Sequence, residues 1–152
     1  MEVKIKYFNG QQPLEKIAKG DWIDLRANED VIIYKGQRKN IPLGVAMELP
    51  QGHHAQIAPR GSTHKKFGII MPNSPGVVDH TFCGDNDEWV MPAYCTDGDS
   101  YDDECNKFYT IIKRGDRICQ FRIVKNMEEF TFTEVKTLGN PDRGLQGSTG
   151  YN

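Results

Sequence analysis

Hydrophobic and polar residues alternate along short stretches of this chain, and glycine, proline, asparagine or aspartate separates one stretch from the next. Residues 3–8 and 117–124 alternate, and residues 31–36 are rich in β-branched side chains. Further stretches of this kind cover residues 40–52, 54–61, 67–73, 76–82, 88–94, 108–116 and 130–138. Because a two-residue period is typical of half-buried strands, the pattern predicts an all-β sandwich or barrel.

The chain has no sustained 3.6-residue periodicity, so the sequence predicts no long helix. A single helical turn is expected at residues 14–20 or at residues 126–130. No internal repeat and no interdomain linker interrupts the pattern. We therefore expect one β domain, residues 1–138, followed by a flexible C-terminal segment at residues 139–152.

The overall charge excludes some classes of partner. The formal net charge is −2, so the chain lacks the basic surface that binding to DNA or RNA requires. No apolar run is long enough to cross a membrane, and the first residues do not form a signal peptide. We therefore expect a cytoplasmic protein that contacts neither nucleic acid nor membrane. A small anionic ligand is compatible, because it needs only a few local arginines.

An acidic segment at residues 95–105, "CTDGDSYDDEC", departs from the strand pattern. Its five carboxylates, at residues 97–104, predict a solvated loop inserted between two strands, which is also a candidate docking site for a protein partner. A calcium loop and a Cys95–Cys105 disulfide are the alternatives, although the spacing does not match an EF-hand. The four cysteines contain no CxxC pair, which disfavours a structural zinc site and favours free thiols.

Five polar clusters combine glycine with charged residues. They lie at residues 20–25, 58–63, 73–79 and 114–120, and in the C-terminal segment. Glycine allows backbone amides to approach an anion closely, and arginine and hydroxyl side chains add further donors. Taken singly, each cluster is more typical of a turn than of a site, because Gly-Asp and Arg-Gly-Asp also occur in hairpin turns.

In their order and spacing the five clusters resemble the five motifs of the trimeric dUTPases, the deoxyuridine triphosphatases. The matching segments are "GDWIDLRA" (20–27), "APRGST" (58–63), "NSPGVVDHTFCGD" (73–85), "RGDRICQ" (114–120) and "RGLQGSTG" (143–150). The resemblance implies a dUTPase-like distorted β jelly roll, or β-clip barrel. It also implies a homotrimer with shared active sites, which hydrolyses dUTP to dUMP and pyrophosphate with Mg²⁺.

In this family the third motif contains the residues that recognise uracil and the catalytic carboxylate. The resemblance makes Asp79 the general base beside the attacking water, a role for which a carboxylate within hydrogen-bond reach suffices. Asn73 and the backbone of Gly76 and Val78 occupy the positions that recognise uracil. Phe82 takes the place of a tyrosine under the deoxyribose. Without the family, Asp79 is interpreted as a turn residue and Phe82 as a core residue.

The other motifs supply the contacts to the phosphates. The resemblance assigns this role to Arg60, Gly61, Ser62, Gln120, Arg143, Gly147, Ser148 and Thr149. It places Asp24 near the water shell of Mg²⁺, an ion that keeps several waters and binds mainly to phosphate oxygens. Asp116 and Arg117 more often brace the fold in this family.

The fifth motif differs from the family at one position. Gln146 stands where a phenylalanine stacks over uracil when the C-terminal segment closes as a lid. Stacking of an aromatic ring on a base contributes about 1–3 kcal/mol, so glutamine is expected to weaken closure. Two alternatives to the enzyme are a nucleotide-binding regulatory protein of this family with weak turnover, and a relative of the dCTP deaminases. The deaminase is disfavoured because no candidate glutamate stands beside the second motif.

Overall fold

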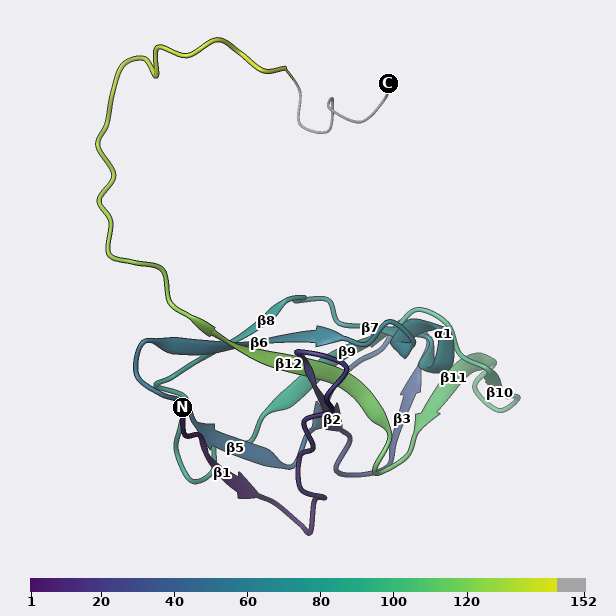
Figure 1. The fold of residues 1–152 in the computed structure, drawn as a ribbon. Coiled ribbons are helices and arrows are strands. Elements are labelled where there is room, and N and C mark those ends of the chain that lie inside the picture. Colours follow the sequence, from purple (N-terminus) through teal and green to yellow (C-terminus); the bar gives the residue numbers. More distant parts are fainter. Residues whose placement is uncertain (145–152) are drawn as a thin grey trace.

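The computed structural model describes residues 1–144 and consists mainly of short strands (Figure 1). In this part of the chain, one short helix, α1 (Thr63–Phe67), accompanies twelve strands. The strands are β1 (Lys4–Tyr7), β2 (Ile23–Arg26), β3 (Val31–Tyr34), β4 (Arg38–Pro42), β5 (Val45–Glu48), β6 (His53–Pro59), β7 (Ile69–Ile70), β8 (Gly76–Asp79), β9 (Val90–Cys95), β10 (Ser100–Asp102), β11 (Lys107–Ile112) and β12 (Arg117–Lys125).

These strands form four small sheets in which all neighbouring strands are antiparallel. The largest sheet has the order β2-β12-β6-β8, and two three-stranded sheets have the orders β4-β9-β7 and β10-β11-β3. Strand β1 pairs with β5. Most neighbours in a sheet are distant in sequence, as in a jelly roll. The all-β, jelly-roll-like fold predicted from the sequence is confirmed.

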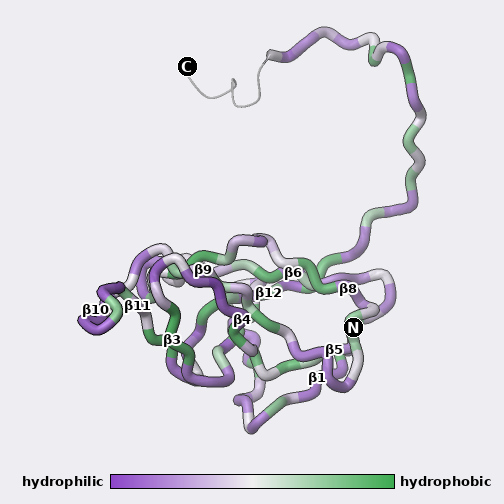
Figure 2. The backbone as a smooth tube through the Cα atoms, turned by 180° about the vertical axis from the view of Figure 1, so that it is seen from behind, coloured by the Kyte–Doolittle hydropathy of each residue, from purple (hydrophilic) through white to green (hydrophobic). Residues whose placement is uncertain are grey.

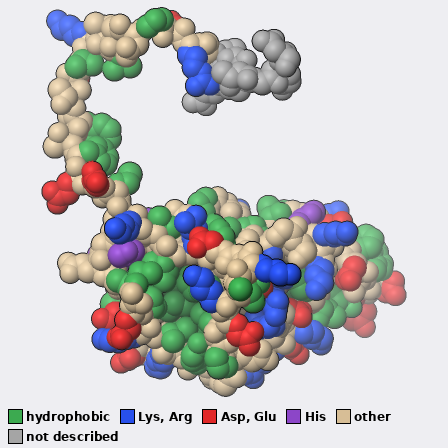
Figure 3. Space-filling model, viewed as in Figure 1, with side chains coloured by type: hydrophobic (Ala, Val, Ile, Leu, Met, Phe, Trp, Pro, Cys, Tyr) green, Lys and Arg blue, Asp and Glu red, His purple; other side chains and the backbone are tan. Residues whose placement is uncertain are grey.

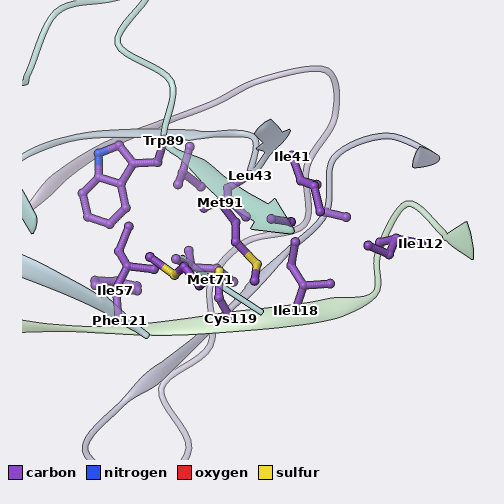
Figure 4. Packing of buried hydrophobic residues seen from close by; sticks show 14 of the residues in the cluster. Ile41, Leu43, Ile57, Met71, Trp89, Met91, Ile112, Ile118, Cys119 and Phe121 are labelled. Atoms are coloured by element: carbon purple, nitrogen blue, oxygen red, sulfur yellow. The ribbon is translucent and has the colours of Figure 1, made fainter. Parts of the chain in front are cut away.

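Apolar side chains from these sheets meet in one core. Figure 2 shows hydrophobic residues concentrated in the strands, and Figure 4 shows their packing. In β6, Ala55 and Ile57 are buried, whereas the residues on either side of them are partly exposed. Trp89 is the largest fully buried side chain, and its ring packs edge-on against Phe121 with centroids 5.3 Å apart. Cys119 packs as a small hydrophobe, as predicted, and burial raises the pKa of its thiol.

The only helix in residues 1–144 lies where the sequence did not predict one. The expected helical turns at residues 14–20 and 126–130 are not formed, and α1 instead follows the second motif. Ser62 precedes the helix, and Gly68 ends it in the left-handed conformation with a φ of 62°. No helix among the described residues is long and apolar enough to cross a membrane.

The acidic segment is attached to this helix and contains a short strand. The carbonyl of Gly68 accepts hydrogen bonds from the amides of Thr96 and Asp97, and a methyl group on Gly68 would collide with the carbonyl of Asp97. The predicted loop includes β10, which forms a hairpin with β11. The alternative of a disulfide in this segment is wrong, because Cys95 is a buried free thiol and Cys105 an exposed one.

Beyond β12 the chain leaves the domain as an extended arm, residues 126–144 (Figure 1). Met127, Phe132 and Leu138 in this arm are 81%, 93% and 83% exposed. The prediction of a strand at residues 130–138 is wrong for the single chain. The physical reason is that a strand needs a neighbour for its backbone hydrogen bonds, and the arm extends away from the sheets.

Candidate active site

Polar side chains of three motifs meet at one end of the β2-β12-β6-β8 sheet. Asp24 on β2 is in register with Gln120 on β12, which is in register with Ala58 on β6. These positions alternate with buried residues, so their side chains lie on the face of the sheet away from the core. Arg60 follows directly after β6. We call this end of the sheet, with Asp24, Arg60 and Gln120, the clamp end.

Asp24 holds two arginines at the clamp end. Its carboxylate forms ion pairs with Arg60 Nε at 2.8 Å and with Arg117 Nη1 at 3.4 Å. One carboxylate neutralises only one of the two guanidinium groups, so the cluster retains a net positive charge beside solvent. Gln120 Nε2 donates to the carbonyl of Pro59 at 3.2 Å, which holds its side chain against the end of β6. The cluster has the charge and the donors that suit a phosphate group.

The loop that carries Arg60 is fixed by Thr63, a buried residue that the sequence analysis did not single out. Thr63 Oγ1 accepts from the amide of Arg60 and donates to the carbonyl of Ile118, both at 2.8 Å. These bonds attach the loop to β12. Gly61 and Ser62 are exposed at the tip of the loop, and the Ser62 hydroxyl does not cap α1. Both predicted phosphate contacts therefore face solvent beside Arg60.

Along the edge strand β8 of this sheet, residues of the third motif line a cavity of about 310 Å³. Its wall contains all the predicted uracil-reading and catalytic residues of this motif, which are Asn73, Gly76, Val78, Asp79 and Phe82. Phe82 is 43% exposed, so the interpretation of this side chain as a core residue is wrong. We call this space the hairpin cavity.

Hydrophobic residues outside the motif close the hairpin cavity from the side of the core. They are Ile57, Met71 and Trp89, which the sequence analysis missed because buried apolar residues carry no signal of a site. A methyl group on Gly76 would come within 2.6 Å of Met71 Cε. Glycine at this position therefore leaves room for the methionine beside the cavity.

The clamp end and Asp79 are far apart within one chain. Asp79 lies opposite His54, near the beginning of β6, whereas Arg60 follows the last residue of this strand. At about 3.3 Å per residue, His54 and Arg60 are separated by about 20 Å along the strand. A general base must lie within hydrogen-bond reach of the water that it activates. One chain therefore does not bring its own Asp79 to its own clamp end.

The remaining predicted residues lie in or near the arm and the fourth motif. Arg143 is an exposed residue of the arm. Asp116 Oδ2 accepts from the amide of Lys113 at 2.8 Å and so braces the turn before β12. Four predicted contacts lie outside the described residues: Gln146, Gly147, Ser148 and Thr149.

Comparison with known proteins identifies the family of this chain. The family model described as dUTPase matches residues 5–91. The SPbeta prophage-derived deoxyuridine 5'-triphosphate nucleotidohydrolase of Bacillus subtilis is 52% identical over 151 residues, which cover 99% of each chain. The chain belongs to the dUTPase family. Another relative, the deoxyuridine 5'-triphosphate nucleotidohydrolase of Finegoldia magna, is 33% identical over 98% of this dUTPase chain and 100% of its own.

Solved dUTPase structures share the fold. The dUTPase from Streptococcus mutans superimposes with a TM-score of 0.70 at 17% identity, over 84% of this chain and 98% of its own. The dUTPase from phage phi11 of S. aureus, whose structure reveals the coordination of a structural Mg(II) ion, has a TM-score of 0.72 at 15% identity. It covers 91% of this chain and 99% of its own. The family predicted from the five motifs is therefore confirmed.

The described residues of this dUTPase offer few side chains that could bind a metal ion directly. Residues 1–144 bring together no group of three or more His, Cys, Asp or Glu side chains that could hold one. The carboxylate of Asp24 is already engaged by Arg60 and Arg117. Mg²⁺ keeps several waters and is commonly bound through one or two carboxylates and the substrate phosphates. The residues present therefore fit an ion carried mainly by the substrate phosphates.

Proposed function

We propose that this dUTPase-family protein hydrolyses dUTP to dUMP and pyrophosphate in the cytoplasm. The observation that carries the proposal is the convergence of five residues of the third motif on the hairpin cavity. The membership of the chain in the dUTPase family supports the same reaction. The positively charged clamp end supplies a second region suited to the triphosphate.

Asp79 is the general base of the proposed reaction. Its carboxylate accepts a proton from a water molecule whose oxygen attacks the α-phosphorus. The bond from this phosphorus to the oxygen that bridges to the β-phosphate then breaks, and pyrophosphate leaves. Arg60, Gln120 and Ser62 stabilise the negative charge that develops on the leaving group. A magnesium ion bound to the substrate would neutralise part of the phosphate charge.

The hairpin cavity selects the base and the sugar. The side chain of Asn73 and the backbone of Gly76 and Val78 pair with the polar edge of uracil. A site built to pair with a polar group strongly rejects an analogue that lacks the matching group, so the exocyclic amine of cytosine is excluded. The ring of Phe82 lies under the deoxyribose and excludes a 2′-hydroxyl by its bulk.

We further propose that the protein is a homotrimer with shared active sites. The separation of about 20 Å along β6 between the residue opposite Asp79 and Arg60 supports this assembly, because a second subunit can supply the missing half. The arm and the residues that follow it offer a third contribution, from Arg143 and from Gln146, Gly147, Ser148 and Thr149. Figure 3 shows apolar side chains along the arm, and a neighbouring subunit would cover them.

The decisive experiment compares the wild-type protein with Asp79→Asn. Pyrophosphate release is measured with dUTP, dCTP, dTTP and UTP, with and without Mg²⁺. We expect preferential turnover of dUTP in the wild type and a fall of at least about 10²-fold in the variant, because general base catalysis contributes about this much or more. Binding of a nonhydrolysable dUTP analogue should survive. A variant that keeps its turnover would contradict the role of Asp79.

The same assay tests the dCTP deaminase. The hairpin cavity does contain a glutamate, Glu88, but its carboxylate accepts a hydrogen bond from the amide of Gly44 at 2.9 Å. This engagement disfavours Glu88 as the base that activates water for attack on a pyrimidine ring. Release of ammonia from dCTP would nevertheless establish the deaminase.

A second function, regulation through a protein partner, is favoured by the β10–β11 hairpin. Tyr101 and Phe108 pack edge to face at 4.9 Å and are 44% and 46% exposed. Asp99 and Asp103, both exposed, lie two residues before and two residues after Tyr101 in the sequence. We propose that a partner with basic residues docks at residues 97–104. Tight binding of dUTP by the wild-type protein with negligible turnover would favour this regulatory function over the enzyme.

A further inference from the structure

His54 lies between the proposed base and the root of the arm. It is on β6, and the register places it directly opposite Asp79 on β8 and Val124 on β12. Residues directly opposite each other in antiparallel strands have Cβ atoms about 5 Å apart on the same face. His54 belongs to none of the five motifs. It nevertheless lies between β8, which carries the proposed general base Asp79, and β12, from which the arm leaves the domain.

Both ring nitrogens of His54 have amide partners. Nδ1 lies 2.8 Å from Oδ1 of Asn126, and Nε2 lies 3.3 Å from Nε2 of Gln56. An amide oxygen only accepts and an amide nitrogen only donates, so Nδ1 carries the proton and Nε2 accepts. The two bonds fix the ring with its N–H directed at Asn126.

Asn126 is the first residue after β12 and forms the root of the arm. Its backbone amide donates to the carbonyl of Gly52 at 2.9 Å, while its side chain accepts from His54. These bonds hold the root from two sides. The next described residues, 127–144, form no strand or helix. Asn126 therefore holds the chain at the point where the arm leaves the domain.

We propose that His54 is a positioning residue: its hydrogen bond to Asn126 fixes the direction in which the arm leaves the domain. This inference rests on the proposed function, in which the arm carries Arg143 to a triphosphate bound between neighbouring subunits. The residues from Asn126 to Arg143 span at most about 60 Å when extended, so a loose root would spread the end of the arm through a larger volume. The effective concentration of Arg143 at the phosphates would fall, and nucleotide binding would weaken.

A matched pair of variants tests the bond. His54→Asn places an amide donor near the position of Nδ1, whereas His54→Gln reaches toward Nε2. We expect His54→Asn to retain the wild-type KM for dUTP. His54→Gln and Asn126→Ala should each raise KM, and the Kd of a nonhydrolysable dUTP analogue, by about fivefold, with kcat changed by less than about twofold. The double variant, with both His54→Gln and Asn126→Ala, should have a KM for dUTP no higher than that of the single variant with the higher KM.

Three results would overturn the inference. The first is an equal KM for His54→Asn and His54→Gln. The second is a lower kcat at constant KM, which would assign His54 to the chemistry at Asp79. The third is an undiminished effect of His54→Gln in an Arg143→Ala background, where the arm no longer supplies its arginine. Failure of the proposed function can be told apart from failure of this inference alone. In that case Arg143→Ala by itself would bind the analogue as tightly as the wild type, and the inference on His54 would fail as well.

Discussion

At position 24 one carboxylate orients the side chains of two arginines. Asp24 is nearer to Arg60 than to Arg117, at 2.8 Å and 3.4 Å, and about a quarter of its side chain is exposed. Solvent screening keeps such a pair weak as a source of stability. Its larger effect is geometric, because it sets the direction of the Arg60 guanidinium before a phosphate arrives.

We predict that Asp24→Asn lowers kcat/KM for dUTP by about tenfold and the free energy of unfolding by at most about 1 kcal/mol. Steady-state kinetics and denaturant unfolding measure the two effects separately. Asp21→Asn is the matched control, since Asp21 forms an exposed pair with Arg122 at 3.3 Å outside the cluster of Asp24. Equal kinetics for both variants would contradict an orienting role for Asp24.

Tyr34 and Asp102 form a hydrogen bond that makes the acidic hairpin sensitive to pH. The hydroxyl of Tyr34 donates to Asp102 Oδ2 at 2.8 Å. This bond, with desolvation and the nearby negative charge, raises the pKa of Tyr34 from 10.0 to about 12. The same bond, with others from Cys105 and the amide of Glu104, lowers the pKa of Asp102.

The stabilisation from Tyr34 is complete below pH 10 and is lost as the pH rises through about 12. That from Asp102 is lost in acid, as the pH falls through its lowered pKa.

We predict that Asp102→Asn returns the ionisation of Tyr34 to the range of an ordinary tyrosine. Alkaline titration followed by phenolate absorbance should show a late phase near pH 12 in the wild type. This phase should move to lower pH in Asp102→Asn and disappear in Tyr34→Phe. A late phase that survives unchanged in Asp102→Asn would assign the raised pKa to another cause.

At the scale of elements, the arm shows what alternation along a sequence can and cannot predict. Residues 130–138 alternate like a strand, and Phe130 and Phe132 pack edge to face with centroids 5.1 Å apart. The pattern records which residues suit a sheet, but it does not say which chain supplies the neighbouring strand. The error at this segment therefore points to a partner for the arm.

We predict that Phe132→Ser weakens subunit association without unfolding the domain. Phe132 is 93% exposed in the single chain and touches the ring of Phe130 in the arm, so its loss leaves the core of the domain intact. Burial of this side chain in an assembly would contribute about 2 kcal/mol. Sedimentation velocity over a range of concentrations measures the shift from trimer to monomer. Phe108→Ser, on the acidic hairpin, is the control that should leave association unchanged. Unaltered sedimentation of Phe132→Ser would remove the arm from the proposed interface.

The helix and the acidic hairpin were misjudged for a different reason. Residues 63–67 are too few to show a helical period, and α1 depends on Thr63 and on the left-handed Gly68 rather than on an amphipathic pattern. Strand β10 lies among carboxylates that are typical of a loop, and it forms because β11 beside it supplies backbone partners. Both elements are determined by contacts that a local sequence window does not contain.

For the whole molecule, the motifs predicted the components of the site but not the distances between them. The grouping of Asn73 with Asp79 follows from their closeness in sequence, and the cavity joins them. The separation of Asp79 from Arg60 follows only from the register of β6 with β8. Residues such as Trp89 enter the cavity wall through packing alone, so nothing in the motifs identified them.

We predict that two inactive variants restore activity when their subunits are mixed. Asp79→Asn lacks the base and Arg60→Ala lacks the clamp, but a site shared between the two chains can contain the wild-type residue of each. Random exchange of equal amounts should restore about a quarter of wild-type turnover per site. Mixtures that remain inactive after subunit exchange, checked by the sedimentation of mixed trimers, would contradict the shared site.

Gly68 gives the molecule an unexpected point of genetic sensitivity. It stands between the loop of Arg60, anchored through Thr63, and the acidic segment, whose Thr96 and Asp97 amides donate to its carbonyl. Any side chain there would force the two apart, because a Cβ atom collides with the carbonyl of Asp97. In a screen for lost nucleotide turnover, a Gly68 mutation would resemble damage to the active site. In recombination between relatives, the arginine loop and the acidic hairpin should be inherited together, because a mismatched pair would not fit around this residue.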